Sequence, residues 1–302
     1  MNDIVKRINE LKKEKNAVIL AHYYVEDEIQ EIADYVGDSF YLAKIATTVK
    51  EDTIVFCGVS FMGESAKILN PKKKVLMPDA SADCPMAHMA SIEKIQEIKK
   101  LYEDVSVVCY VNSSAKLKSY SDVCVTSSNA LKIVKNISSK NIFFIPDENL
   151  GRYVAGKLPE KNFIFNDGYC PIHKDMTKKN LLRVKEKYPN AKVMVHPECT
   201  DDVLKLADYI GSTSGIIDYA TESDEKEFIV VTELGVLYEL RCKNPNKKFY
   251  DLGIGQCCPD MKKITLEKVL NSLVNNESEV ILDKELMKKA YIPLKRMLEM
   301  GK

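Results

Sequence analysis

Short apolar runs alternate with segments of helical periodicity along the whole chain. Residues 17–22 form an apolar run ending in polar residues, typical of a buried strand, and Ile29, Ile32 and Val36 then fall at helical spacing. The alternation predicts a parallel α/β fold in which helices connect successive strands. Strands are predicted at residues 17–22, 35–39, 53–57, 74–78, 105–111, 121–126, 141–145, 163–165, 192–195, 209–211, 228–231 and 249–252.

This pattern occurs three times with a domain-sized period. The same dipeptide and the same helix N-cap recur at steps of 86 and 88 residues. A period this long exceeds the ~20–50 residues of solenoid repeats, so each unit is predicted to be a small domain. The recurring positions are Cys84-Pro85, Cys170-Pro171 and Cys258-Pro259, followed by the caps Ser91, Thr177 and Thr265.

The predicted fold is three homologous parallel-sheet α/β/α domains about a pseudo-threefold axis, with one central site. The first repeat, with an N-terminal helix, is assigned to residues 1–103, and the second to residues 104–189. The third, with a C-terminal helix, is assigned to residues 190–302. We expect the helix near residues 284–299, which contains Pro293, to pack against the N-terminal helix.

Charge and composition narrow the function classes. The chain carries 44 basic and 44 acidic side chains, which argues against a nucleic-acid or membrane-surface protein. Residues 1–16 are charged and amphipathic, unlike a signal peptide, and no apolar run approaches the ~18 residues of a membrane span. We therefore expect a cytoplasmic protein without a nucleic-acid or membrane partner. Its nine cysteines then favour metal-binding or catalytic use over disulfides.

Polar side chains recur where the first strand of each repeat ends. Ligands of parallel sheets bind beyond the carboxyl ends of the strands, and residues i and i+2 of a strand share a face. Seventeen residues after the first polar position, each repeat has a hydroxyl at a strand-to-helix turn, a place that favours anions. The set is His22, Tyr24 and Ser39, then Tyr110, Asn112 and Ser127, then His196, Glu198 and Thr213.

Two other groups of residues are assigned structural roles. Asp34, Asp122 and Asp208 also align, but each precedes a short strand, which favours a capping or structural role. The cysteines outside the register are expected to be core or incidental residues. These are Cys57, Cys109, Cys124, Cys199, Cys242 and Cys257.

Three thiolates, one from each domain, suit a metal centre with an open position. Cys84, Cys170 and Cys258 converge if the domains meet about a common axis. They leave one coordination position free, as catalytic metal sites do. Soft sulfur ligands select zinc or an iron–sulfur cluster, and a [4Fe–4S] cluster on three cysteines leaves one iron open as a Lewis acid.

The polar residues around such a centre have chemistry of the expected kind. Glu198 and the histidines can move protons, and the tyrosines can donate to a developing oxyanion. The hydroxyls can hold carboxylates or a phosphate. These residues predict a three-domain metalloenzyme but do not choose its substrate.

Several motifs resemble those of the quinolinate synthase A family, in the family's order and spacing over nearly the whole chain. The family's fold is three homologous α/β domains around an axis, as the repeats also predict. The motifs are Ala21-His22-Tyr23-Tyr24, Gly37-Asp38-Ser39, Asp83-Cys84-Pro85-Met86-Ala87, Tyr110-Val111-Asn112-Ser113, Gly168-Tyr169-Cys170-Pro171-Ile172-His173, His196-Pro197-Glu198-Cys199, Gly211-Ser212-Thr213 and Cys258-Pro259-Asp260-Met261-Lys262-Lys263.

The resemblance implies a transferase that condenses iminoaspartate (iminosuccinate) with dihydroxyacetone phosphate. The products would be quinolinate, phosphate and water, which begins the pyridine ring in NAD biosynthesis. An L-aspartate oxidase would supply the iminoaspartate.

The resemblance also implies site roles. Cys84, Cys170 and Cys258 would hold one [4Fe–4S] cluster per chain, and Tyr24 with Glu198 would assist proton transfer. The implied catalytic residues are His22, Tyr24, Tyr110, His196 and Glu198. The implied substrate-binding residues are His22, Ser39, Tyr110, Asn112, Ser127, His196, Glu198 and Thr213.

Alternatives remain at this point. Cys257 directly precedes Cys258, although the register and the spacing to Met261 favour Cys258 as the third ligand. Other hypotheses are a zinc hydrolase with three cysteine ligands and an electron-transfer protein in which Cys257 or Cys199 completes four thiolates. A hydro-lyase resembling aconitase would share the open-iron chemistry.

Overall fold

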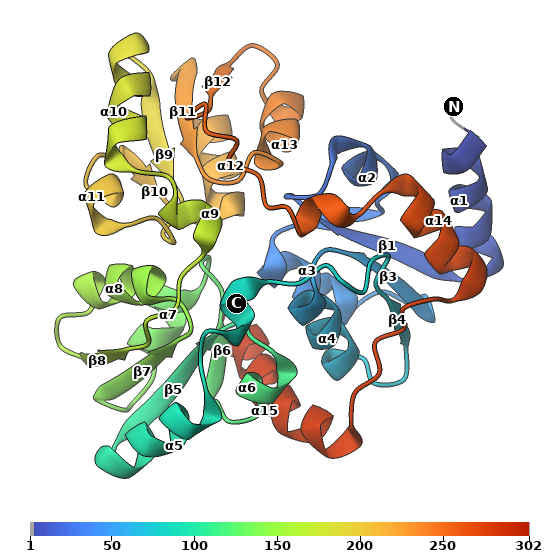
Figure 1. Cartoon of the computed structure of the whole chain (residues 1–302), viewed down its shortest axis with the longest axis horizontal. Coiled ribbons are helices and arrows are strands. Elements are labelled where there is room, and N and C mark those ends of the chain that lie inside the picture. Colours follow the sequence, from blue (N-terminus) through green and yellow to red (C-terminus); the bar gives the residue numbers. More distant parts are fainter. Residues whose placement is uncertain (1–2, 302) are drawn as a thin grey trace.

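Three separate four-stranded sheets surround a common centre in the computed structural model, which describes residues 3–301 (Figure 1). Within each sheet the named strands pair in parallel, and the third strand along the chain lies between the first and the fourth. The architecture predicted from the sequence, a parallel α/β fold written three times, is confirmed.

The strands lie close to their predicted positions. The first sheet has the order β2 (Tyr35–Gly37), β1 (Ala17–His22), β3 (Thr53–Cys57), β4 (Lys74–Leu76). The second has the order β6 (Val123–Val125), β5 (Val105–Tyr110), β7 (Asn141–Ile145), β8 (Asn162–Phe165). The third has the order β10 (Tyr209–Ile210), β9 (Lys192–Val195), β11 (Glu227–Val231), β12 (Lys248–Tyr250).

Helices cover these sheets and connect their strands. The first part of the chain forms α1 (Asp3–Glu14), α2 (Asp27–Ile32), α3 (Ser39–Ala46), α4 (Ser60–Leu69), η1 (Pro85–His88) and α5 (Ile92–Leu101). The middle forms α6 (Ala115–Lys118), α7 (Ala130–Lys135), α8 (Glu148–Lys157), α9 (Pro171–Lys174) and α10 (Lys178–Lys187). The last part forms α11 (Asp201–Leu204), α12 (Thr213–Glu222), α13 (Val236–Lys243), η2 (Met261–Lys263), α14 (Leu266–Asn275) and α15 (Lys284–Met300).

The three aligned aspartates have the structural role expected of them. In each repeat the aspartate Oδ2 accepts a hydrogen bond from a backbone N–H of the first strand, at 2.8 Å. This bond anchors the turn before the short edge strand to the inner strand. The pairs are Asp34 with Ile19, Asp122 with Val107 and Asp208 with Val193.

The predicted N-caps Ser91, Thr177 and Thr265 are also confirmed, because each hydroxyl accepts from the backbone N–H three residues later. The helix that each one starts packs against the next sheet along the chain: α5 contacts β5 and α10 contacts β11. The last of them, α14, contacts α1 and β3 and so returns to the first sheet. Because the last helix of each repeat packs against the following sheet, the three repeats form a closed ring. The division of the chain at residues 103/104 and 189/190 stays a prediction.

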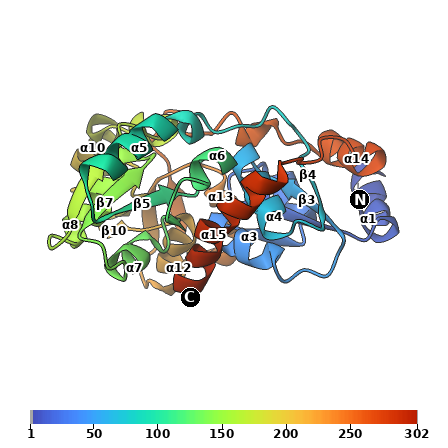
Figure 2. The same ribbon diagram turned by 90° about the horizontal axis from the view of Figure 1, so that it is seen from below.

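The expected packing of the C-terminal helix on the N-terminal helix is wrong. The helix α15 packs against α4, α6 and β6, while α1 packs against α14 (Figure 2). Ala290, Leu294 and Met297 form the buried face of α15 and join an apolar cluster shared by the first two sheets. Periodicity identified this face correctly, but an amphipathic helix does not specify which groove it fills.

The core is divided unequally among the repeats. One apolar cluster runs through the first two sheets and includes α14 and α15. The third sheet has two clusters of its own, one on each face, because alternate residues of β11 point to opposite sides. Within residues 3–301 no helix is both long and apolar enough to cross a membrane.

Replacing Leu294 with Ala tests the position of α15. The leucine is fully buried, so its truncation should lower the free energy of unfolding by about 2–5 kcal/mol, measured by denaturant titration. Ile292→Ala on the same helix is the matched control, because Ile292 is 52% exposed and should change stability little. Equal effects of the two substitutions would contradict the packing described.

Candidate active site

A cavity of about 140 Å³ lies where the carboxyl ends of the three sheets meet. Its walls come from all three repeats and contain acidic, hydroxyl, imidazole and thiol groups, but no lysine or arginine among the described residues. All twelve side chains selected from the sequence line it. They are His22, Tyr24, Ser39, Cys84, Tyr110, Asn112, Ser127, Cys170, His196, Glu198, Thr213 and Cys258.

Two imidazoles are held in the same way at equivalent strand ends. His22 Nδ1 accepts from the backbone N–H of Tyr24 at 3.2 Å, and His196 Nδ1 accepts from that of Glu198 at 3.4 Å. A neutral ring that accepts at Nδ1 carries its proton on Nε2, and His196 Nε2 lies 3.2 Å from Ser127 Oγ. Burial lowers the pKa of each histidine to about 3, so both rings are neutral hydrogen-bond donors.

The three predicted hydroxyls lie at the starts of helices. Ser39 and Thr213 are the first residues of α3 and α12, and Ser127 lies in the turn before α7. The caps Asp38 and Ser212 accept backbone N–H groups and fix the first turns of α3 and α12. Helix starts attract anions, so these turns contribute partial positive charge to the cavity wall without a basic side chain.

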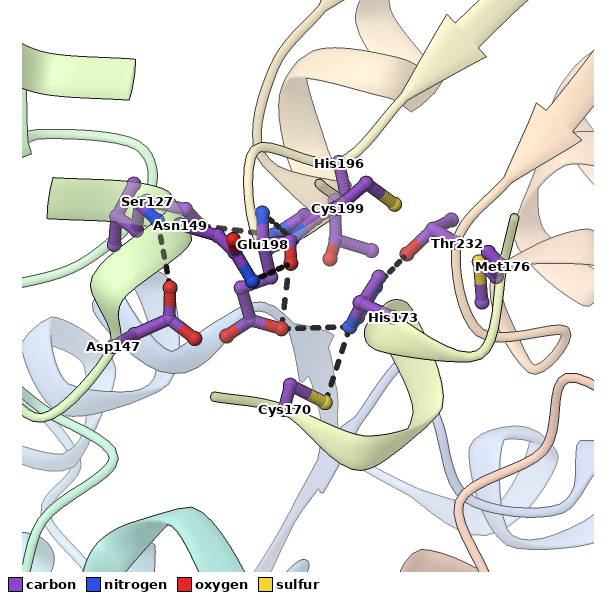
Figure 3. A network of polar contacts seen from close by, with 12 residues as sticks. Ser127, Asp147, Asn149, Cys170, His173, Met176, His196, Glu198, Cys199 and Thr232 are labelled. Atoms are coloured by element: carbon purple, nitrogen blue, oxygen red, sulfur yellow. Dashed lines mark hydrogen bonds and ion pairs between the residues drawn. The ribbon is translucent and has the colours of Figure 1, made fainter. Parts of the chain in front are cut away.

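Glu198 is the buried carboxylate of the site (Figure 3). Its Oε2 lies 2.7 Å from His173 Nδ1 and 3.6 Å from His196 Nδ1. Burial alone would raise the pKa of Glu198, but its contact with His173 outweighs burial and lowers the pKa to about 2. Glu198 is therefore ionised and available as a proton acceptor.

A chain of hydrogen bonds joins Tyr24 to Glu198 across the repeats. The Tyr24 hydroxyl lies 2.8 Å from Thr213 Oγ1 and 2.9 Å from Thr232 Oγ1. Thr232 Oγ1 lies 3.0 Å from His173 Nε2, and the same ring reaches Glu198 through Nδ1. The two residues paired in the sequence analysis are thus connected indirectly, through a threonine and a histidine. Burial raises the pKa of Tyr24 well above its usual value, so its phenol keeps its proton.

Some buried acceptors of the site have no hydrogen-bond partner among the described residues. These are Glu198 Oε1, Asn112 Oδ1 and Asp147 Oδ2. Glu198 and Asn112 line the cavity, so their oxygens can bind a ligand. Asp147 lies next to Glu198 (Figure 3), and burial together with the charge of Glu198 raises its pKa well above the usual value.

Sequence reasoning missed His173, Thr232 and Glu233. His173 follows Cys170 by three residues, but Ala87 and Met261 hold the equivalent positions, so the repeat register gave no signal. Composition could have found it, because the chain has four histidines and three of them line the cavity. The strand-end residue Glu233 follows Asp147 by 86 residues, a register match that the sequence does show.

The cysteines that were candidates for the third or a fourth ligand position lie in different places. Cys258 lines the central cavity, whereas Cys257 lines a separate surface pocket with Tyr238 and Lys262. The Cys199 thiol is buried 3.8 Å from the carbonyl oxygen of Val231. Neither Cys257 nor Cys199 lines the cavity, so this geometry favours Cys258 as the third ligand.

The three central thiols fit a multinuclear iron–sulfur group. All three are free, and all three line the same cavity. Burial, with Glu198 next in effect, raises the pKa of Cys84 to about 12 and that of Cys170 well above its usual value, so their ionisation calls for a nearby cation. In a [4Fe–4S] cluster each thiolate binds a different iron, which suits thiols that face one cavity from three sides.

A single metal ion fits less well. The ligands of one zinc lie about 3.3–3.8 Å apart by its bond lengths, yet the three cysteine sulfurs do not all lie within 4.8 Å of one another. Among the described residues one group meets that limit, Cys170, His173 and Glu198. Its His173 Nδ1 and Glu198 Oε2 are only 2.7 Å apart, a hydrogen-bond distance, so this group is a hydrogen-bonded chain.

Comparison with known proteins decides the family. The family model described as quinolinate synthetase A protein matches residues 6–299. The chain belongs to this family. A quinolinate synthase of Clostridioides difficile is 55% identical over 98% of this chain and 97% of its own length. Proteins of the same name from Fusobacterium nucleatum (54%, 98% of each chain) and Aquifex aeolicus (48%, 100% of this chain and 95% of its own) are also similar.

Family membership makes this chain an enzyme of the quinolinate synthase type. The resemblance seen in the motifs is thereby confirmed, and so is the three-sheet α/β architecture that it implied. The family is known for an iron–sulfur cluster, and the convergent thiols fit one.

Thr232→Val tests the hydrogen-bonded chain between Tyr24 and His173. Valine keeps the shape of threonine but removes a hydroxyl that takes part in two hydrogen bonds, each worth about 1 kcal/mol. We expect the kcat of quinolinate formation to fall about 10- to 30-fold. Thr232→Ser, which keeps the hydroxyl, should retain most activity. Equal kcat values for the valine variant and the wild type would contradict a role for this chain.

Proposed function

We propose that the enzyme condenses iminoaspartate with dihydroxyacetone phosphate, giving quinolinate, phosphate and water. Cys84, Cys170 and Cys258 would hold the [4Fe–4S] cluster that this reaction uses. The observation that carries the proposal is the meeting of these three thiols, one from each repeat, in the cavity that also holds Glu198. The proposal places the enzyme in NAD biosynthesis, with an L-aspartate oxidase as the supplier of iminoaspartate.

The cavity is suited to a dicarboxylate that is recognised by neutral donors. His22 and His196 present neutral imidazoles, and Ser39, Ser127 and Thr213 present hydroxyls at helix starts. Hydrogen bonds from such groups hold carboxylates without a buried lysine or arginine, whose own desolvation would be costly. The amide of Asn112 adds a donor and an acceptor to the same wall.

The side chains can also move the protons that the reaction requires. Isomerisation, dehydration and ring closure each need one group to accept a proton and another to return it. Glu198 is ionised and can accept, while Tyr24 and Tyr110 keep their protons and can donate to a developing negative charge. Thr232 and His173 connect the Tyr24 hydroxyl with Glu198. A bound cluster would supply Lewis acidity through the iron that has no protein ligand.

Two alternatives from the sequence are less well supported. A zinc hydrolase needs three sulfurs spaced for one ion, which the structure does not show. A four-thiolate electron carrier needs Cys257 or Cys199 at the centre, and neither lines the cavity. A hydro-lyase resembling aconitase shares the open-iron chemistry and differs in releasing no phosphate from a triose phosphate.

The decisive experiment is an anaerobic assay of the purified full chain with iminoaspartate and dihydroxyacetone phosphate. We expect equal amounts of quinolinate and inorganic phosphate, with no quinolinate when either substrate is omitted. A protein that contains iron and acid-labile sulfide but forms no quinolinate would contradict the proposed substrates. A colourless protein with one zinc and no sulfide would contradict the proposed cluster.

Serine substitutions at the adjacent cysteines test the ligand assignment. Cys258→Ser should lose the iron and acid-labile sulfide of the anaerobic protein, because a hydroxyl is a poor ligand for a soft metal site. Cys257→Ser is the matched control and should keep both, because Cys257 lies outside the cavity. The opposite result would reassign the third ligand to Cys257.

A further inference from the structure

A buried carboxylate lies behind the third cysteine. Glu233, at the turn after β11, is 1% exposed and reaches the loop that carries Cys258. Its Oε1 accepts the backbone N–H of Cys258 at 3.0 Å, and its Oε2 accepts that of Gly235 at 2.6 Å. Both oxygens therefore hold backbone groups, one of them on a cysteine that lines the cavity.

The loop before Cys258 is held at several points by hydrogen bonds. It includes Gly253 and Gly255, both with φ of +67°, a conformation that side-chain-bearing residues rarely adopt. Gln256 fixes its middle by donating to the carbonyl oxygens of Val230 and Thr232. The bond from Glu233 fixes its end, at the cysteine itself.

Glu233 also connects this loop to the first repeat. Lys262 Nζ lies 3.7 Å from Glu233 Oε1 and 3.8 Å from Glu26 Oε2. The buried amide of Gln30 donates to the carbonyl oxygens of Gly235 and Tyr23, at 3.1 and 2.9 Å. The Cys258 loop and the segment that carries Tyr24 are thus joined through one network.

The repeat register places a buried acid at the equivalent position of the second repeat. Asp147 precedes Glu233 by 86 residues, is fully buried at the turn after β7, and interacts with the backbone of Cys170. In the first repeat the equivalent residue is the apolar Val59. There the backbone N–H of Cys84 donates to Asp83 Oδ1 instead, at 2.8 Å. A side-chain carboxyl group thus accepts the backbone N–H of Cys84 and that of Cys258, from positions that are not equivalent in the repeats.

We propose that Glu233 is a positioning residue, which fixes the Cys258 loop so that its thiol faces the cavity ready to bind the cluster. Groups that orient metal ligands from behind raise affinity by restricting the ligand before it binds, and their loss typically costs 10- to 100-fold. Each of the two carboxyl oxygens of Glu233 accepts one backbone N–H, so a single side chain fixes both positions. This inference rests on the cluster proposed above and extends it to a residue outside the ligand set.

Glu233→Gln tests the proposal with little change in volume. Glutamine has one oxygen, so at most one of the two N–H groups keeps its acceptor. The matched control is Asp208→Asn in the same repeat, because Asp208 also accepts a backbone N–H but lies away from the cavity. Anaerobic proteins would be compared by iron and sulfide content, the rate of iron transfer to a chelator and the electron paramagnetic resonance (EPR) spectrum of the reduced cluster.

We expect Glu233→Gln to release iron at least about 10-fold faster than the wild type and to alter the EPR spectrum. Asp208→Asn should lower the thermal midpoint without either change. Glu233→Asp, which keeps both oxygens on a shorter stem, should release iron at an intermediate rate and carries the test if the glutamine variant does not fold.

Three outcomes would overturn the proposal. Wild-type release rates in the Glu233 variants would show that the carboxylate does not position Cys258. Equal acceleration in Asp208→Asn would show a general loss of stability. A normal cluster with lost turnover would show that Glu233 acts on substrate. A wild-type chain without acid-labile sulfide would instead refute the cluster itself, so the two failures are distinguishable.

Discussion

Parallel pairing of the inner strands is the constraint on which the site depends. The strand β1 is buried along its whole length, and β5 and β9 are nearly so, because helices cover both faces of each sheet. Polar side chains can therefore emerge only where these strands end. Three sheets that meet at their carboxyl ends bring His22, Tyr110 and His196 to one cavity. The central site is a consequence of strand burial repeated three times.

The electrostatics of this site are unusual for a centre expected to bind anions. Lysine and arginine are missing from the described lining, and His22 and His196 are neutral, so attraction comes from helix starts and oriented hydrogen bonds. Glu198 keeps its charge because His173 contacts it at 2.7 Å, while burial keeps Tyr24, Tyr110 and the Cys84 thiol protonated. The tyrosines therefore stay protonated and can donate, while Glu198 stays ionised and can accept. Acid–base chemistry at neutral pH requires such a difference in pKa.

The repeats explain which features could be predicted from the sequence. Polar residues that recur in register in all three repeats were found, because three copies of one pattern distinguish a site residue from an accidental one. The match of Asp147 with Glu233 was missed, because the equivalent residue of the first repeat is Val59. His173 was missed since Ala87 and Met261 replace it in the other repeats, and Thr232 because its role depends on contacts among three repeats. The position of α15 was predicted wrongly, since an apolar stripe defines a buried face but not its partner. The strand predicted at residues 35–39 ends earlier, at Gly37, because Asp38 caps the helix α3 that begins at Ser39.

The central claim is that three repeats hold one cluster whose open iron faces the substrate. Mössbauer spectroscopy of the chain reconstituted with ⁵⁷Fe, with and without a dicarboxylate analogue of iminoaspartate, tests it most directly. We expect about four irons per chain, with the signal of one in four changing when the analogue binds. A spectrum in which no iron responds to a bound analogue, or a chain that binds a single metal ion, would contradict the account.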